Sequence, residues 1–411
     1  MKTFKLIVLT LLLFGCKNEK KSTITKYNSI DIEQDLAINN QDLIVVDQDY
    51  DKALKIASKM DKSIFIDFYT TWCAPCKELD KLVFQNDSIQ KILKKNIILL
   101  KYNAENDTVF HLSKKHHVSS YPTGLILNKN GYVINRKYGF PGNDFEVLST
   151  NVLDFIKESV ELNEKSQVLK GYSNKIDVSK YPKFYIDYVN RTNTKINNSE
   201  LRDYLINTSD KFSEEYFSTL AYFGRDAPVN IANLVLKNKQ KYIDSYGKLD
   251  VDILMYFLAG GKFEQAIDEK SRKKFKEAVI FAKAGLSSKW TDTMVPAFEK
   301  EFLKAQDKWY EVYEINQKLK DNGKFDNGYI NHFSWQVYKD CDDQKVIKKC
   351  LNWMKEVTDE EPTYLYLDTY AHLLYKSGNN EDAKNIALLA LEVGKNEDDR
   401  TASIEKLIKK L

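Results

Sequence analysis

Two cysteines separated by two residues, Cys73 and Cys76, are the side chains in this sequence best suited to chemistry. Thiols at this spacing form a disulfide readily, and a thiolate attacks the disulfides of other molecules. Cys73 is the expected nucleophile, and Cys76 is placed to attack the resulting mixed disulfide and release the substrate. Pro75 is tolerated here because the first turn of a helix does not use the N–H that proline lacks. The predicted chemistry is thiol–disulfide exchange, with no cofactor beyond the disulfide itself.

The same spacing also occurs in half of a zinc site, and His111, His116 and His117 are the residues that would complete one. However, zinc-finger ligands lie much closer together in sequence than Cys76 and His111 do, and the chain has no second pair of this kind. We therefore predict no metal. His116 and His117 are expected to be exposed loop residues without a chemical role.

The segments on either side of the pair predict a strand that leads into a helix. Residues 64–69 form a short β-branched and aromatic run, and residues 76–95 carry apolar side chains at helical spacing, with a break at 86–88. Both thiols therefore lie at or just before a helix N-terminus. The free N–H groups and the positive dipole end there lower a thiol pKa from ~8.5 to ~7 or less.

Residues 67–77 resemble the active-site segment of thioredoxins, whose Trp-Cys-Gly-Pro-Cys-Lys core here has Ala74 in place of the glycine. The resemblance implies that Trp72 and Pro75 contact substrate. It also implies that Asp67 is a buried carboxylate that assists proton removal from Cys76. From the residues alone, an ordinary strand carboxylate is the less favoured alternative for Asp67.

Two more distant matches support the same resemblance. Lys101 corresponds to the lysine that neighbours the aspartate on the next strand, although a solvated lysine is an equally good interpretation of the residue alone. Tyr121 and Pro122 resemble the cis-proline loop that faces the thiols. The resemblance implies that Tyr121 offers its backbone to an extended substrate peptide.

The predicted elements of residues 41–162 follow the thioredoxin order βαβαβαββα. This order predicts an α/β fold in which helices cover both faces of a mixed sheet. The hairpin turns at Asn130-Gly131, and Asn106 is the expected cap of the third helix. The expected strands are 43–46, 64–69, 97–102, 124–128 and 132–137, and the expected helices are 50–60, 76–95, 107–116 and 142–162.

The first forty residues predict export and lipid attachment. Lys2 and Lys5 precede an apolar run at 6–14, which is too short to span a bilayer and is typical of a signal peptide, here residues 1–15. The run ends at Cys16 in a sequence that resembles the lipobox of bacterial lipoproteins. Residues 16–40 then form a polar tether. We expect a lipid-anchored protein of the bacterial cell envelope that faces the periplasm, with the outer membrane favoured; the alternative is a cleaved soluble protein.

Residues 163–411 predict an all-α helical-repeat domain, because strand-like alternation disappears and apolar residues recur at helical spacing. The pattern is clearest over 330–393, where Ala371, Ala383 and Ala387 fall at the small-residue positions of a tetratricopeptide-like repeat. Cys341 and Cys350 are expected to be unpaired structural thiols. The chain has 62 basic and 59 acidic side chains, so its charge predicts no nucleic-acid partner.

The leading functional hypothesis is a lipid-anchored thiol–disulfide oxidoreductase that reduces disulfides of envelope proteins. Reduction is favoured because Ala74 and Pro75 add no charge that would stabilise the Cys73 thiolate strongly. Such a reductase needs a membrane electron donor as a second partner. Two alternatives stay open: an oxidase or isomerase that uses the same thiols, and a scaffold whose helical half binds a protein partner.

Overall fold

The computed structural model describes residues 42–396 and 401–411. The expected signal segment 1–15, the tether 16–40 and the lipidation site Cys16 lie outside the described residues. Within the described ranges, no helix combines the length and the apolar character needed to cross a membrane.

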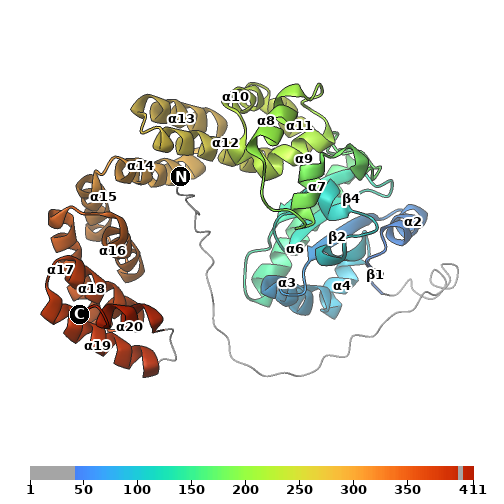
Figure 1. Ribbon diagram of the computed structural model, residues 1–411. Helices are drawn as coiled ribbons and strands as arrows, with labels where there is room; N and C mark the ends of the chain where they lie inside the picture. Colours follow the sequence, from blue (N-terminus) through green and yellow to red (C-terminus); the bar gives the residue numbers. More distant parts are fainter. Residues whose placement is uncertain (1–41, 397–400) are drawn as a thin grey trace.

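A five-stranded mixed sheet forms the first part of the chain (Figure 1). The strand order is β1-β3-β2-β4-β5; β1, β3 and β2 run parallel, and β4 and β5 run antiparallel to their neighbours. The predicted α/β thioredoxin fold is confirmed. The strands are β1 Val45–Asp47, β2 Ser63–Tyr69, β3 Ile97–Asn103, β4 Thr123–Leu127 and β5 Val133–Tyr138.

The helices of this part alternate with the strands nearly as predicted. The helix expected at 107–116 is reduced to one short turn, because the Asp107 carboxylate accepts the N–H groups of Leu112 and Ser113 and so lies outside the helix. Asn106 is therefore not its cap. The helices are α2 Tyr50–Met60, α3 Ala74–Leu79, a π-helical turn Asp80–Phe84, α4 Asp87–Leu93, a 3₁₀ turn Ala104–Asn106, α5 Leu112–Lys115 and α6 Phe145–Glu164.

The last helix of this part, α6, starts later than the predicted residue 142. Asp144 caps it by accepting the N–H of Val147 at 2.9 Å, and Gly142 lies in the left-handed region with φ +123°. A positive φ cannot continue a right-handed helix, so the helix begins at Phe145. It ends at Glu164, two residues beyond the expected boundary at 162.

The remainder of the chain is helical in every described regular element, as the fold class predicted. In Figure 1 α7 and α9 lie beside the sheet, α12 and α13 lie farther from it, and α14–α20 lead away as an arc. The helices are α7 Lys183–Val189, α8 Asn198–Asn207, α9 Glu214–Phe223, α10 Val229–Lys237, α11 Lys239–Tyr246, α12 Lys248–Asp268, α13 Arg272–Gly285, α14 Ser288–Ala305, α15 Trp309–Asp321, α16 Asn327–Asp340, α17 Gln344–Glu360, α18 Tyr364–Lys376, α19 Asn380–Asn396 and α20 Ala402–Ile408, with 3₁₀ turns at Val178–Lys180 and Gly224–Asp226.

The two faces of the sheet are covered differently. Side chains that alternate along the strands, such as Phe65 and Leu99, pack against α3, α4 and α6 in one cluster. Their neighbours Ile66 and Leu100 point to the opposite face and pack with α2. That second cluster continues without a break into the helical region, as far as Phe302. The sheet and the first helices of the helical region therefore share one hydrophobic core.

The C-terminal helices form two further clusters. One centres on α15–α17 and the other on α18–α20. The alanines expected at small-residue positions, Ala371, Ala383 and Ala387, are completely buried between α18 and α19. Gly378 turns the chain between these helices with φ +87°, a conformation that glycine adopts at little cost.

Candidate active site

The cysteine pair lies where β2 passes into α3. Cys73 and Cys76 form a disulfide, and each residue is only 3% exposed. Cys73 is the N-cap of α3, and its Sγ accepts the N–H of Cys76 at 3.2 Å. Pro75 occupies the first turn of the helix, as predicted. A thiolate released at Cys73 would keep this hydrogen bond and the positive end of the helix, and both favour its charged form.

A buried carboxylate lies on β2, six residues before Cys73. Asp67 is completely buried, and its Oδ2 accepts a hydrogen bond of 2.6 Å from Nζ of Lys101. Burial raises the pKa of Asp67, while Lys101 opposes the shift. Its other oxygen, Oδ1, is buried and has no hydrogen-bond partner within the described residues. The carboxyl group can therefore hold or accept a proton at that atom.

Lys101 lies next to Asp67, as predicted. Lys101 faces Asp67 across the β2–β3 pairing and also contacts Oδ1 of Asp80 at 2.7 Å. Burial lowers the pKa of Lys101, but the two carboxylates outweigh it and raise the pKa above its ordinary value. The interpretation of Lys101 as a merely solvated side chain is wrong, because only 16% of its side chain is exposed.

The loop before β4 carries the other predicted residues. The Tyr121–Pro122 peptide bond is cis, as expected. The ring of Tyr121 meets the ring of Trp72 edge to face, with 6.0 Å between the centroids, and Trp72 is 63% exposed. The structure thus brings Trp72, Tyr121 and the cysteine pair together. Their roles toward substrate remain predictions.

A cleft of about 600 Å³ opens beside these residues. Glu105 lies on its wall, and its Oε2 accepts both the N–H and the hydroxyl of Thr71 at 2.7 Å. These hydrogen bonds lower the pKa of Glu105. Residues 189–192 of the helical region also line the cleft. Of the residues that line the cleft, Trp72 and Tyr121 were predicted from the sequence, whereas Glu105 and residues 189–192 were not. The resemblance ends before residue 189, and nothing in the sequence indicates which helical loop reaches the cleft.

His116 and His117 are not exposed loop residues; that prediction is wrong. Each is 2% exposed, because the helical region covers them. The ring of His117 stacks on Tyr172 and meets Phe217 edge to face, with centroids 6.0 and 5.5 Å away. Residues 114–118 lack the apolar run that normally marks a covered surface, so no pattern in the sequence indicates that helices cover them.

Charged side chains surround His117 in this interface. Nη1 of Arg136 donates to Nε2 of His117 at 2.9 Å, and the Asp250 carboxylate lies 3.5 Å from both groups. Burial and the neighbouring Arg136 lower the pKa of His117 to about 4, so its ring is neutral at pH 7. Burial alone would raise the pKa of Asp250, but Arg136 and His117 bring it down to about 2. Asp250 and Arg136 therefore form a buried ion pair between the sheet and α12.

Tyrosine hydroxyls from the helical region hold the segment that leads to the cis-proline loop. Tyr185 donates to the carbonyl of Lys114 at 2.6 Å, and Tyr222 donates to the carbonyl of Val118 at 2.7 Å. Lys115 forms an ion pair with Glu214 of α9. The helical region is thus bonded directly to the backbone that positions one side of the active site.

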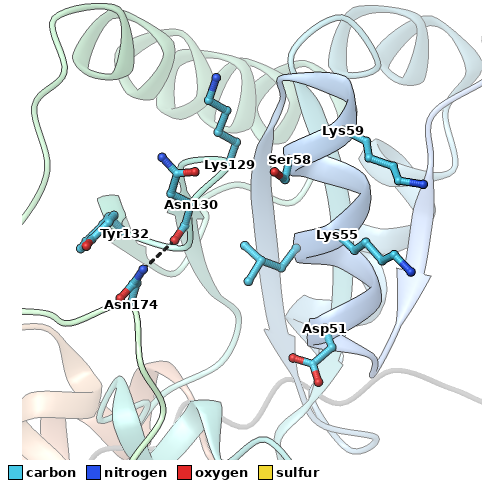
Figure 2. Close-up of a pocket in the computed structure, with 9 residues that line it drawn as sticks. Asp51, Lys55, Ser58, Lys59, Lys129, Asn130, Tyr132 and Asn174 are labelled. Atoms are coloured by element: carbon cyan, nitrogen blue, oxygen red, sulfur yellow. Dashed lines mark hydrogen bonds between the residues drawn. The ribbon is translucent and has the colours of Figure 1, made fainter.

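A second hollow, of about 710 Å³, lies away from the cysteines (Figure 2). It is bounded by α2 and by the turn between β4 and β5, where Asn174 donates to the carbonyl of Asn130 at 3.1 Å. The strand register places this turn at the start of β2, opposite the end that delivers Cys73. Figure 2 shows Lys55 and Lys59 extending from the side of α2 that faces away from Asn130. The hollow is therefore separate from the redox site.

The other two described cysteines are buried in the C-terminal helices. Cys341 and Cys350 are unpaired, as predicted, and each is completely buried. Burial raises the pKa of Cys341 to about 11 and that of Cys350 to about 12. Both are therefore protonated and unreactive at neutral pH. Within residues 42–396 and 401–411, no group of three or more histidine, cysteine or carboxylate side chains is arranged to hold a metal ion.

Comparison with known proteins adds independent information. Residues 45–129 match the family model described as thioredoxin-like. Thioredoxin-1 of Drosophila melanogaster is 32% identical over 109 residues, which are 26% of this chain and 92% of that protein. The thiol:disulfide interchange protein DsbD of Yersinia pestis is 34% identical over 80 residues, or 18% of this chain and 13% of that protein. A solved structure described as DsbH oxidoreductase covers 29% of this chain and 86% of its own, with 16% identity and a TM-score of 0.24.

The mixed sheet and the disulfide-forming cysteine pair at the N-terminus of α3 define a thiol–disulfide oxidoreductase of thioredoxin-like fold. The match at 32% identity over 92% of the length of a known thioredoxin identifies the family more narrowly. The chain belongs to the thioredoxin family through its first part, and an all-helical region follows that part.

Proposed function

We propose that this protein is a lipid-anchored reductase of disulfides in proteins of the bacterial envelope. The observation that carries the proposal is the Cys73–Cys76 pair at the N-terminus of α3, with only Ala74 and Pro75 between the thiols. The buried carboxyl of Asp67 and the exposed Trp72 beside the pair support the same chemistry. The proposal also assigns roles to five side chains: Lys101 tunes Asp67, and Trp72, Pro75, Tyr121 and Pro122 contact the substrate.

The reaction transfers two electrons in two exchanges. The Cys73 thiolate attacks one sulfur of a substrate disulfide; a mixed disulfide forms, and the first substrate thiolate leaves and takes up a proton. Asp67 accepts the proton of Cys76 at its free Oδ1, and the Cys76 thiolate then attacks Sγ of Cys73. The second substrate thiol is released, and the Cys73–Cys76 disulfide remains. A dithiol electron donor at the membrane restores the reduced pair.

The direction of electron flow follows from how weakly the thiolate is stabilised. A strongly oxidising pair needs additional groups that stabilise its reduced form, and the residues between these cysteines provide none. We expect a potential nearer the ~−270 mV of thioredoxin than the ~−120 mV of strong oxidants. Equilibration of the pair against glutathione measures it. A value more positive than ~−200 mV would favour the oxidase or isomerase instead.

Insulin reduction driven by dithiothreitol tests the enzymatic assignment. The wild-type protein should accelerate precipitation of the insulin B chain, and a Cys73→Ser variant should give only the background rate. A Cys350→Ser variant, which changes a buried thiol far from the pair, is the matched control and should behave as wild type. Equal rates for the wild type and Cys73→Ser would leave the scaffold alternative, in which the helical region binds a protein partner.

Asp67→Asn tests the proton transfer. The amide keeps the shape of the side chain but cannot accept the Cys76 proton, so the release of a mixed disulfide trapped on Cys73 should slow by roughly 10²-fold or more near neutral pH. Formation of that mixed disulfide should change little. Equal release rates in the variant and the wild type would remove Asp67 from the mechanism.

The envelope location rests on the sequence of residues 1–16 and on the likeness to a thiol:disulfide interchange protein. Acyl labelling and membrane fractionation of the wild type and a Cys16→Ala variant test it. The wild type should incorporate label and sediment with membranes, preferentially the outer membrane. A Cys16→Ala protein that stays membrane-bound would contradict the lipid anchor.

A further inference from the structure

The helical region supplies part of the cleft beside the redox pair. Residues 189–192, at the end of α7 and just after it, line the same space of about 600 Å³ as Trp72, Glu105 and Tyr121. That volume suits a few side chains of a bound peptide. A substrate cysteine that reaches Cys73 past Trp72 must therefore place its neighbouring residues close to this loop.

The position of Arg191 within this loop is well defined. Its N–H donates to the carbonyl of Tyr188 at 3.0 Å, and its φ of +58° lies in the left-handed region that ends a helix. The hydroxyl and the N–H of Thr192 both donate to the carbonyl of Asp187, at 3.1 and 3.0 Å. These bonds tie the loop to the end of α7. The loop can therefore present a side chain to the cleft with little additional ordering cost.

Arg191 is the exposed cation of the cleft. Its side chain is exposed and makes no ion pair within the described residues. The other cation on the wall, Lys114, is buried and lies 3.4 Å from the Asp107 carboxylate, which balances its charge. Glu105 is near enough for Arg191 to lower its pKa slightly, but its Oε2 already accepts two hydrogen bonds from Thr71.

We propose that Arg191 is a specificity-determining residue that favours extended peptide segments with an aspartate or glutamate close to the reacting cysteine. The inference rests on the proposed reductase function and names its substrate class. An acidic side chain beside the cysteine would reach the free guanidinium, whose planar fork binds carboxylates well. A lysine at the same place would be repelled by Arg191. The chemical steps are those of the exchange described above.

Mixed disulfides between short peptides and thionitrobenzoate provide the test, because the released chromophore reports each attack by Cys73. Three peptides that differ only in one residue beside the cysteine, aspartate, asparagine or lysine, are compared with the full-length protein. The wild type should favour the aspartate peptide over the lysine peptide by roughly two- to fivefold in kcat/KM, mainly through KM, as expected for a solvent-exposed ion pair. Added salt should reduce this preference.

The variants are chosen to preserve the backbone. Asparagine and aspartate tolerate the left-handed conformation, so Arg191→Asn should abolish the preference and Arg191→Asp should reverse it. Arg202→Glu changes an exposed arginine on α8 that does not line the cleft, and it should retain the wild-type preference. Circular dichroism verifies that each variant is folded.

The outcomes are distinguishable. Equal rates with all three peptides in the wild type, or an unchanged preference in Arg191→Asp, would overturn the role of Arg191 while leaving the reductase intact. A loss of preference in Arg202→Glu as large as in Arg191→Asp would assign the effect to overall charge and would also overturn it. Failure of the wild type to release the chromophore from any peptide would instead overturn the proposed function.

Discussion

The helices that touch the sheet and the helices that lead away from it are built on different principles. Most of the buried side chains of α7–α13 belong to the same hydrophobic core as one face of the sheet, and this interface contains a buried ion pair and several tyrosine hydrogen bonds. The helices α15–α20 bury their apolar side chains among themselves, in two separate clusters. The helices α7–α13 therefore form one structural unit with the sheet and the cysteine pair, here called the redox unit. The helices α15–α20 are attached to this unit but have hydrophobic clusters of their own.

The largest expected effect comes from removing each group of helices. A chain of residues 42–164 exposes Leu112 and Val118, whose burial contributes about 3–6 kcal/mol together. A chain of residues 42–308 keeps the shared core. We expect urea unfolding to show that 42–164 loses most of its stability, whereas 42–308 unfolds cooperatively and still reduces insulin. Equal stability of the two fragments would show that the shared core does not hold the redox unit together.

Asp250→Ala should have the next largest effect. The substitution leaves the guanidinium of Arg136 buried without its carboxylate, and breaking a buried ion pair in this way costs about 3–5 kcal/mol. Denaturant unfolding measures the loss. The matched control is Asp359→Ala on α17, whose ion pair with Lys355 is exposed on both sides and should contribute about 0–1 kcal/mol. Similar losses for the two variants would remove the distinction between the regions.

The shared interface should also be sensitive to acid. The pKa of His117 falls from 6.5 to about 4 on folding. Between these values the unfolded chain binds a proton that the folded chain does not, so stability falls as the pH decreases from 6.5 to 4. The loss should be on the order of 3 kcal/mol. Asp250, whose pKa is lowered to about 2, adds a further loss below pH 4.

A His117→Gln variant separates these contributions. Glutamine has no proton to gain in this range, so the variant should show a flatter dependence of unfolding free energy on pH between 6.5 and 4. Its stability at pH 7 serves as the reference for the comparison. A slope as steep as that of the wild type would assign the acid sensitivity to another group.

The sequence predicted the thioredoxin-like part of the chain much better than the helices that cover it. The run from Asp67 to Cys76 is one continuous segment that resembles the thioredoxin motif, and the strand and helix that contain it follow local patterns, so its geometry could be predicted. The pair of Asp67 and Lys101 was expected from the resemblance to thioredoxins, and the register of the parallel strands β2 and β3 accounts for it. The surroundings of His117 could not be predicted, because Tyr172, Phe217 and Asp250 come from the helical region, more than fifty positions away. Arg191 could not be predicted either, because it lies beyond the residues that the resemblance covers. No local periodicity encodes such contacts.

The smallest expected effect concerns Cys350, in the helices that lead away from the sheet. Its thiol is completely buried in the cluster of α15–α17, so Cys350→Ala should remove about 1 kcal/mol of packing from that cluster. The cluster contains no residue of the sheet, and therefore the midpoint potential of Cys73 and Cys76 and the rate of insulin reduction should not change. Val118→Ala removes a comparable volume from the shared core, next to a backbone carbonyl that Tyr222 holds, and it should alter the exchange rate as well as the stability. A change in potential in the Cys350 variant would show that the outer helices are coupled to the active site after all.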